Sequence, residues 1–366
     1  MALGCLDHPV AQSAICARCA ALEQAARARR RRWLVGIVLA APVLGIGGYL
    51  IARSSGPKPI ISATSADPID QIQRERLAQT PCDLETHAAR VHHLMKLERW
   101  QDALEAAHRA IGCGARGQVQ WHVVYINQQL HRWFPAAIGA TEQIAGDPHD
   151  SDYWWWRGEA WAEGELPQLA LADYRQSIAS SASPEAARFA VGRFYAPAHA
   201  AHEPCEAERA WHYFVEHFEG EPNDEMRDQS ATLIRNGSCV AEHGTGRATL
   251  SGKVRATVAG ATGTFAIDYF AGTTLVSRLF AGKAGLVASD KPLATGLVEF
   301  RPVLGEPITL SKVAVGGAAT TNVDALIVDE LPAGVDGTLG LSFLWHFDWT
   351  WADDGVRVTP LHVTPL

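Results

Sequence analysis

The sequence predicts a multidomain α + β protein with a transmembrane helix, an α-helical solenoid and then an all-β domain that carries short helices. Three observations support this fold class. One long uncharged apolar run lies at residues 33–52, helical periodicity with an internal repeat occupies residues 81–242, and β-rich segments follow over residues 245–366. The composition, with 47% hydrophobic and 20% charged residues, is that of a globular protein and excludes a wholly disordered chain.

Charge is unevenly distributed along the chain. Residues 1–32 form a basic head, in which six Arg oppose Asp7 and Glu23, whereas the whole chain has a net charge of −8. The head therefore carries +4 and the remainder −12, which argues against a nucleic-acid partner. A basic head before an acidic body indicates that a membrane separates them.

The membrane segment is predicted from Trp33 to Ala52. Its twenty residues, at about 1.5 Å rise per residue, match the ~30 Å hydrocarbon core of a bilayer. Arg is concentrated just before this run, so the positive-inside rule predicts a cytoplasmic N-terminus and an external body over residues 53–366. We therefore expect a protein of the bacterial inner membrane with a periplasmic body. The alternative is a cleaved signal peptide, but no A-x-A site follows the run.

Four residues of the basic head have the spacing of a metal site. Cys5, His8, Cys16 and Cys19 form C-x2-H-x7-C-x2-C, and two short ligand pairs can close a tetrahedral zinc site. The pattern resembles the B-box or zinc-ribbon knuckles that precede membrane anchors in some bacterial proteins, which implies a structural zinc ion. The alternative is a set of reduced thiols.

The other cysteines all lie in the predicted external body. They are Cys82, Cys113, Cys205 and Cys239. An even number in an oxidising compartment predicts two disulfides, and pairing of nearest neighbours suits a stacked helical array. The alternative is that all four are buried free thiols.

Residues 53–80 are predicted to be a flexible tether, because they are rich in Ser, Pro and small residues. The helical region at 81–242 has an internal period. Its clearest unit carries large, small and aromatic positions at Trp154, Gly158, Trp161, Ala170 and Tyr174. Equivalent positions recur 33–34 residues earlier.

This spacing resembles that of the tetratricopeptide repeat, whose small residues let antiparallel helices approach closely. The resemblance implies a groove for a peptide or a protein partner. The alternative is that the hairpins only space the C-terminal domain from the membrane. Trp154, Trp155 and Trp156 are the candidate partner-binding residues, although such a run is also typical of a hydrophobic core.

The C-terminal region, from residue 245, has the texture of β structure. Apolar and polar residues alternate at 253–258, and we expect further strands at 263–269, 296–303, 307–315, 323–328 and 356–363, in segments separated by Gly, Asn and Asp. We also expect two short helices, at 274–282 and at 341–347.

Three segments of this region resemble the retropepsin-like aspartic protease domain. Residues 265–277, FAIDYFAGTTLVS, match the strand and loop with the family's Asp; residues 322–331 match the next inner strand; and residues 336–349 match an apolar-apolar-Gly motif with its helix. The resemblance implies an aspartic endopeptidase that works as a homodimer. Each chain would supply one carboxylate, here Asp268, and the two would share a proton around a water.

The residues after Asp268 depart from the family pattern. The family has Thr and Gly there, whereas this chain has Tyr269 and Phe270. A phenol cannot make the short bond of the Thr hydroxyl across a dimer, and Phe270 adds bulk where water and substrate should lie.

The sequence is compatible with two functions. One is a membrane-anchored periplasmic scaffold that binds peptides or proteins and whose protease-like domain is a pseudoenzyme. The other is an active membrane-tethered endopeptidase, in which Asp268 of each protomer forms the catalytic pair.

Overall fold

The computed structural model describes residues 67–235, 239, 243–352 and 355–361. The predicted zinc ligands and the predicted membrane segment lie outside these residues. Among the helices that the structure does describe, none has the length and apolar character required to cross a membrane. Two compact units divide the chain, Met1–Thr86 and His87–Leu366.

The first unit contains α2 (Pro68–Gln79), within the residues predicted to be a tether. The prediction was wrong for this segment because its start signals are those of a helix. The Asp67 carboxylate accepts a hydrogen bond from the Ile69 N–H at 3.0 Å, and Pro68 occupies the first helical turn. The following helix, α3 (Leu84–Lys96), runs from the first unit into the second.

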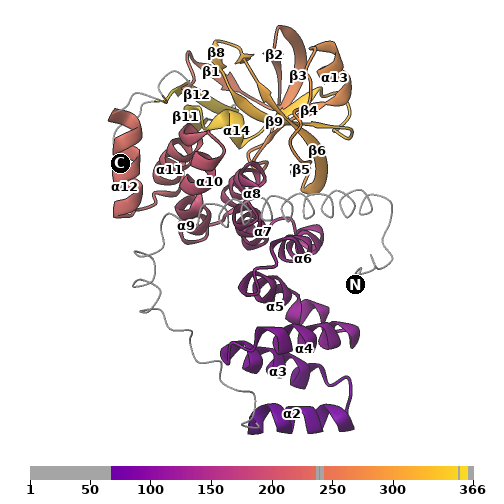
Figure 1. Ribbon diagram of the computed structural model, residues 1–366. Helices are drawn as coiled ribbons and strands as arrows, with labels where there is room; N and C mark the ends of the chain where they lie inside the picture. Colours follow the sequence, from indigo (N-terminus) through magenta and orange to yellow (C-terminus); the bar gives the residue numbers. More distant parts are fainter. Residues whose placement is uncertain (1–66, 236–238, 240–242, 353–354, 362–366) are drawn as a thin grey trace, which may run out of the picture. The chain divides into compact units, whose positions relative to one another are not determined.

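The second unit continues with helices that succeed one another along the chain (Figure 1). They are α4 (Trp100–Gly112), α5 (Arg116–Gln129), α6 (Trp133–Gly146), α7 (Ser151–Glu163), α8 (Pro167–Ser180), α9 (Pro184–Arg193), α10 (Tyr195–Ala200), α11 (Pro204–Phe218) and α12 (Asp224–Arg235). The starts of α4, α6 and α8 are 33 and 34 residues apart. Neighbouring helices from α4 to α8 pack against each other.

The α7–α8 pair shows how small and charged residues allow close packing. A Cβ added to Gly158 would lie 2.6 Å from the Tyr174 ring, so only glycine fits there. The Arg157 guanidinium donates two hydrogen bonds of 2.7 Å to the Asp173 carboxylate, and both side chains are buried. Trp154 is also fully buried and therefore belongs to the core, not to a contact surface.

The strands that follow form two sheets. They are β1 (Ala248–Leu250), β2 (Lys253–Val258), β3 (Ala261–Ile267), β4 (Thr274–Ser277), β5 (Ala294–Val298), β6 (Arg301–Leu310), β7 (Val313–Val315), β8 (Ala318–Thr320), β9 (Val323–Val328), β10 (Gly337–Leu339), β11 (Phe347–Ala352) and β12 (Gly355–Pro360). The orders are β5-β6-β9-β4-β10-β3-β2-β7-β8 and β1-β12-β11.

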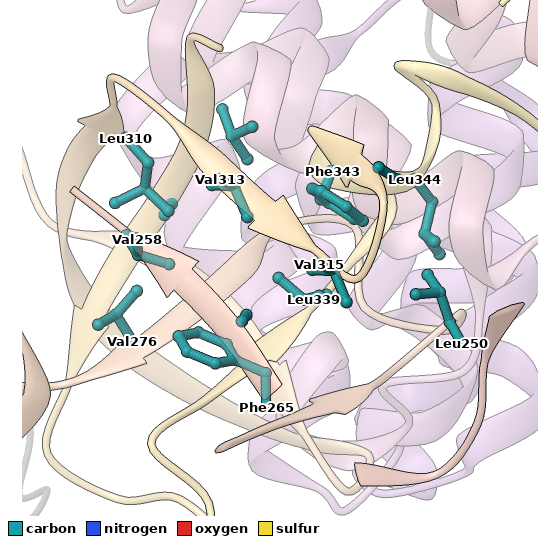
Figure 2. Close-up of a cluster of buried hydrophobic side chains, with 14 of the residues drawn as sticks. Leu250, Val258, Phe265, Val276, Leu310, Val313, Val315, Leu339, Phe343 and Leu344 are labelled. Carbon is teal, nitrogen blue, oxygen red and sulfur yellow. The ribbon is translucent and has the colours of Figure 1, made fainter. Parts of the chain in front are cut away.

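The hydrophobic core of this β domain lies between the strands and two short helices, α13 (Arg278–Lys283) and α14 (Leu341–Leu344). Figure 2 shows side chains from distant strands pointing toward one another, among them Phe265 on β3, Val276 on β4 and Leu339 on β10. Burial of these apolar groups fixes the strands that carry the candidate site.

Some of the predicted elements are displaced in the structure. Residues 274–277, predicted to begin a helix, form β4, and helix α13 starts only at Arg278. The helix predicted at 341–347 is the four-residue α14, and the chain turns into strand β11 at Phe347. In both places β-rich residues find strand partners, which outweighs local helix preference: β4 pairs with β9 and β10, and β11 pairs with β12.

Candidate functional site

Asp268 directly follows β3, at a point where the chain crosses next to β10. Its backbone N–H donates to the Leu339 carbonyl at 3.1 Å, and its carboxylate accepts a hydrogen bond from the Phe270 N–H at 3.1 Å. The second bond spans two residues and closes an Asx turn. The structure therefore places Asp268 at the end of a strand, as the sequence predicts, and gives its carboxylate a local structural role.

The environment of Asp268 favours its neutral form. Burial raises the pKa of the Asp268 carboxyl above its ordinary value, although the N–H groups of Phe270 and Ala271 act to lower it. The nearby negative charge of Glu299 raises it further. Glu299 itself lies 3.7 Å from the Arg301 guanidinium. An acid with this shift retains its proton to a higher pH than a solvated aspartic acid.

The two residues that replace the family's Thr and Gly point to different neighbours. The Tyr269 ring lies 4.6 Å from that of Trp351, on β11. The Phe270 ring lies 5.5 Å from that of Phe300, at the tip of the β5–β6 hairpin, and Phe270 remains 53% exposed. The expected bulk beside Asp268 is therefore present, as an aromatic contact between its loop and the hairpin.

Helix α8 holds the same loop from another direction. The Gln176 side-chain amide donates to the Phe270 carbonyl at 2.7 Å, and its oxygen accepts from the Gly272 N–H at 2.8 Å. Gln176 is only 1% exposed. A Cβ added to Gly272 would lie 2.5 Å from the backbone nitrogen of Gln176. The helix backbone and the loop are therefore in direct contact.

The contact of α8 with the β domain extends beyond Gln176. Leu169 and Ala172 join one apolar cluster whose members on the strands are Leu275, Ala294, Val298, Leu326 and Val328. Arg175, one residue before Gln176, donates to the Asp324 carboxylate at 2.5 Å and lies 3.4 Å from that of Glu206. Apolar burial, an ion pair and the Gln176 bonds thus combine at one surface.

Sequence reasoning did not identify Gln176 or Arg175. The only signal in the sequence was Gly272, which stands where the family has a hydroxyl residue and which proves to be the point of closest approach to α8. A polar residue inside a helical repeat carries no mark of a partner 94 or 96 residues away in the chain.

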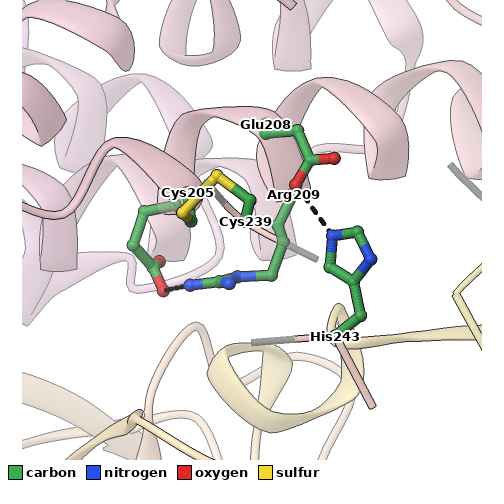
Figure 3. Close-up of a disulfide and its surroundings, with 6 residues drawn as sticks. Cys205, Glu208, Arg209, Cys239 and His243 are labelled. Atoms are coloured by element: carbon green, nitrogen blue, oxygen red, sulfur yellow. Dashed lines mark hydrogen bonds and ion pairs between the residues drawn. A yellow bond between two sulfur atoms is a disulfide. The ribbon is translucent and has the colours of Figure 1, made fainter. Parts of the chain in front are cut away.

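The predicted disulfide between Cys205 and Cys239 is present. It joins the start of α11 to the segment after α12, and Figure 3 shows it beside Arg209, with Glu208 and His243 nearby. Cys82 and Cys113 are also disulfide-bonded.

Two further features concern the Trp residues and metal binding. Trp155 and Trp156 are partly buried, and their rings lie 5.6 Å from Phe189 and 5.8 Å from Tyr125. Among the described residues, no cluster of His, Cys, Asp or Glu has the arrangement of a metal site.

The C-terminal region is similar to known proteins. A family model described as aspartyl protease matches residues 254–343, from β2 to α14. The match covers about a quarter of the chain, lies within the C-terminal β domain, and supports the aspartic protease resemblance of that domain. A solved structure described as a retropepsin-like aspartic protease from Rickettsia conorii is 20% identical, with a TM-score of 0.26. It covers 32% of this chain and 94% of its own. A search of the curated proteins finds no match.

Proposed function

We propose that this chain is a membrane-anchored periplasmic scaffold that binds peptides or proteins, and that its retropepsin-like domain does not hydrolyse them. In this proposal residues 33–52 are the anchor, and Cys5, His8, Cys16 and Cys19 hold a structural zinc ion in the cytoplasmic head. The helical hairpins, with their likeness to tetratricopeptide repeats, receive the partner. The Cys205–Cys239 disulfide supports an oxidising compartment for the body.

One observation carries the proposal: helix α8 occupies the main-chain groups beside Asp268. Hydrolysis requires a substrate peptide bond and a water next to two carboxylates that share a proton. Here the Phe270 carbonyl and the Gly272 N–H are already bonded to Gln176. The Phe270 ring adds further crowding on the side of the β5–β6 hairpin. A substrate therefore cannot bind these two main-chain groups while α8 is in place.

The alternative is an active endopeptidase, formed as a homodimer that pairs Asp268 of each protomer. Its support is the retained carboxyl group at the end of β3, whose pKa is raised by burial and which could therefore act as a general acid. This function requires α8 to move away from the loop.

Hydrolysis is tested with the full chain in detergent micelles and a fluorogenic decapeptide library, between pH 4 and pH 7. We expect no cleavage that depends on Asp268, so wild type, Asp268→Asn and the exposed-site control Asp290→Asn should give the same background rate. Cleavage by wild type and Asp290→Asn that disappears in Asp268→Asn would establish the endopeptidase instead.

Binding is tested separately from hydrolysis. The same library is passed over immobilised full chain, and retained peptides are identified by mass spectrometry. We expect retention by wild type that persists in Asp268→Asn. A chain that retains no peptides would exclude peptide binding and leave folded proteins as the partner class of the scaffold.

A further inference from the structure

A small pocket opens between helix α8 and the β domain. Its charged lining residues are Arg175 of α8, Asp324 of β9 and Lys291 of the segment before β5. Apolar side chains that include Leu169 and Leu326 form its walls, and its empty volume, with the open mouth included, is about 390 Å³. A ligand in this pocket would therefore have a polar end among the charges and an apolar end against the walls.

Arg175 has a donor group that the fold does not use. Its Nη2 donates to the Asp324 carboxylate at 2.5 Å, and its Nε lies 3.4 Å from the Glu206 carboxylate. Its Nη1 has no hydrogen-bond partner among the described residues, although the side chain is only 2% exposed. A buried guanidinium donor without an acceptor is costly, so an oxygen atom is expected beside it in the pocket.

Six ionisable side chains meet at this end of α8, of which three are basic and three are acidic. They are Arg175, Arg209, Lys291, Glu203, Glu206 and Asp324. Burial, together with the charges of Asp324 and Glu206, raises the pKa of Glu203 to about 7, so below that pH the cluster has one positive charge in excess. Because these groups are poorly solvated, the excess charge favours a bound anion.

A carboxylate suits the pocket better than a larger anion does. Its two oxygens allow one to accept from Arg175 and the other to face the Lys291 ammonium group. The enclosed part of the pocket has room for a small group only, and the charge of Asp324 in the lining disfavours a doubly charged anion such as phosphate. The apolar walls suit a short aliphatic chain attached to the carboxylate.

We propose that the pocket between α8 and the β domain binds the carboxylate of an aliphatic acid, which Arg175 and Lys291 hold. The acid is a free short-chain acid or the C-terminal end of a polypeptide, and the chemistry at the pocket is the same. Binding is linked to protonation of Glu203, because neutral Glu203 releases Lys291 from their 3.4 Å ion pair. This inference goes beyond the scaffold function and does not depend on what the helical hairpins bind.

Isothermal titration calorimetry of the full chain in detergent micelles tests the site with isovalerate, and isovaleramide is the uncharged control. We expect isovalerate to bind about tenfold more tightly at pH 6 than at pH 8, since only the form with neutral Glu203 is competent to bind. Isovaleramide should not bind at either pH.

Three variants assign the effect to the residues of the cluster. Glu203→Gln, which is always uncharged, should bind isovalerate equally well at both pH values. Lys291→Gln should bind about tenfold more weakly at pH 6, because one charge-assisted contact is lost. Lys312→Gln changes an exposed Lys of the same domain and should behave as wild type. Circular dichroism checks the fold of each variant, and the pH dependence of Glu203→Gln decides if Lys291→Gln does not fold.

A peptide pair distinguishes the two sources of the carboxylate. It is an acetylated pentapeptide that ends in Val, with a free C-terminal carboxyl group or with a C-terminal amide. Binding of the free-acid peptide alone identifies a chain end as the ligand, whereas binding of isovalerate without either peptide identifies a free acid.

The negative outcomes are equally distinct. No binding of isovalerate would show that the pocket holds only water, and equal binding of isovaleramide would show that the walls alone attract the ligand; either result overturns the inference. Unchanged affinity in a folded Lys291→Gln chain, or pH dependence that persists in Glu203→Gln, would also overturn it. None of these negative results bears on peptide retention by the helical hairpins, so the scaffold function is tested separately.

Discussion

Glu203 lies among buried and half-buried charges where α11 begins. Its carboxylate is 3.4 Å from the Lys291 ammonium group of the β domain. Burial, together with the negative charges of Asp324 and Glu206, raises the pKa of Glu203 to about 7, against the smaller opposing effects of Lys291 and Arg175. Ionisation of this one carboxyl group therefore opposes the contact between the helices and the β domain.

This shift makes stability depend on pH. The folded pKa lies above the unfolded value of about 4.3, so the folded chain binds more protons between these values and loses stability as pH rises toward 7. We expect Glu203→Gln to weaken this dependence and to be more stable than wild type at pH 8 by roughly 1–3 kcal/mol. Urea unfolding at pH 5 and pH 8 measures it. The exposed control Glu330→Gln should behave as wild type, and equal pH dependence in all three chains would contradict the assignment.

At the scale of residues, Asp268 could be located from the sequence but its bonding could not. The apolar run before it and the Gly340 motif later in the chain predict a strand end beside an inner strand, which the structure has. Gln176 and Arg175 could not be found, because the role of a polar helix residue depends on which surface the helix meets. That surface is set by tertiary packing, not by local sequence.

At the scale of elements, the α7–α8 pair depends on one missing side chain. Gly158 lets the Tyr174 ring lie against the α7 backbone, and the Tyr174 hydroxyl donates to the Glu159 carboxylate at 2.5 Å. The sequence places a small residue at this position of the repeat, and the structure gives the reason. Because α8 also carries Gln176, the position of this helix bears directly on the candidate site.

Substitution of Gly158 tests this packing. Gly158→Ala should destabilise the chain by about 1–3 kcal/mol, since the methyl group would overlap the Tyr174 ring. Gly117→Ala, in α5, meets nothing within 4 Å and should stabilise by about 0.5–1 kcal/mol through helix propensity. Thermal unfolding of both variants gives the comparison. A Gly158→Ala chain as stable as Gly117→Ala would show that the helices can separate without loss.

The short elements were harder to predict than the long ones. Helices with a clear period, such as α7 and α8, follow from sequence spacing alone. Residues 274–277 include two β-branched side chains, Thr274 and Val276, whose strand preference is weak in so short a segment, and their pairing with β9 and β10 decides for a strand. The turn at Glu299 and Phe300, both with positive φ, was likewise hidden within a single predicted strand.

At the scale of the whole molecule, the Cys205–Cys239 disulfide links the last helices ahead of the β domain. It closes a loop with a sequence separation of 34 residues. Arg209, on the same helix as Cys205, donates to the Glu206 carboxylate at 2.6 Å, and Glu206 in turn lies 3.4 Å from Arg175 of α8. The covalent link thus lies close to the charges that hold α8 against the β domain.

Removal of this link should weaken the folded chain. For a loop of this length, the paired substitution Cys205→Ser with Cys239→Ser is expected to lower the free energy of unfolding by about 3–4 kcal/mol. Urea unfolding of the oxidised double variant and of wild type measures the loss, with Cys82 and Cys113 retained in both chains. If the two chains unfold at the same urea concentration, the loop does not constrain the unfolded state.

The interface between α8 and the strands has a consequence for truncated forms of this protein. A chain cut between α12 and β1 would leave Leu275, Ala294, Leu326 and Val328 facing water where Leu169 and Ala172 now cover them. A β domain separated in this way would expose an apolar patch and tend to aggregate. Because the helices cover this apolar surface, we expect the β domain to be soluble only when it is expressed together with them in a single chain.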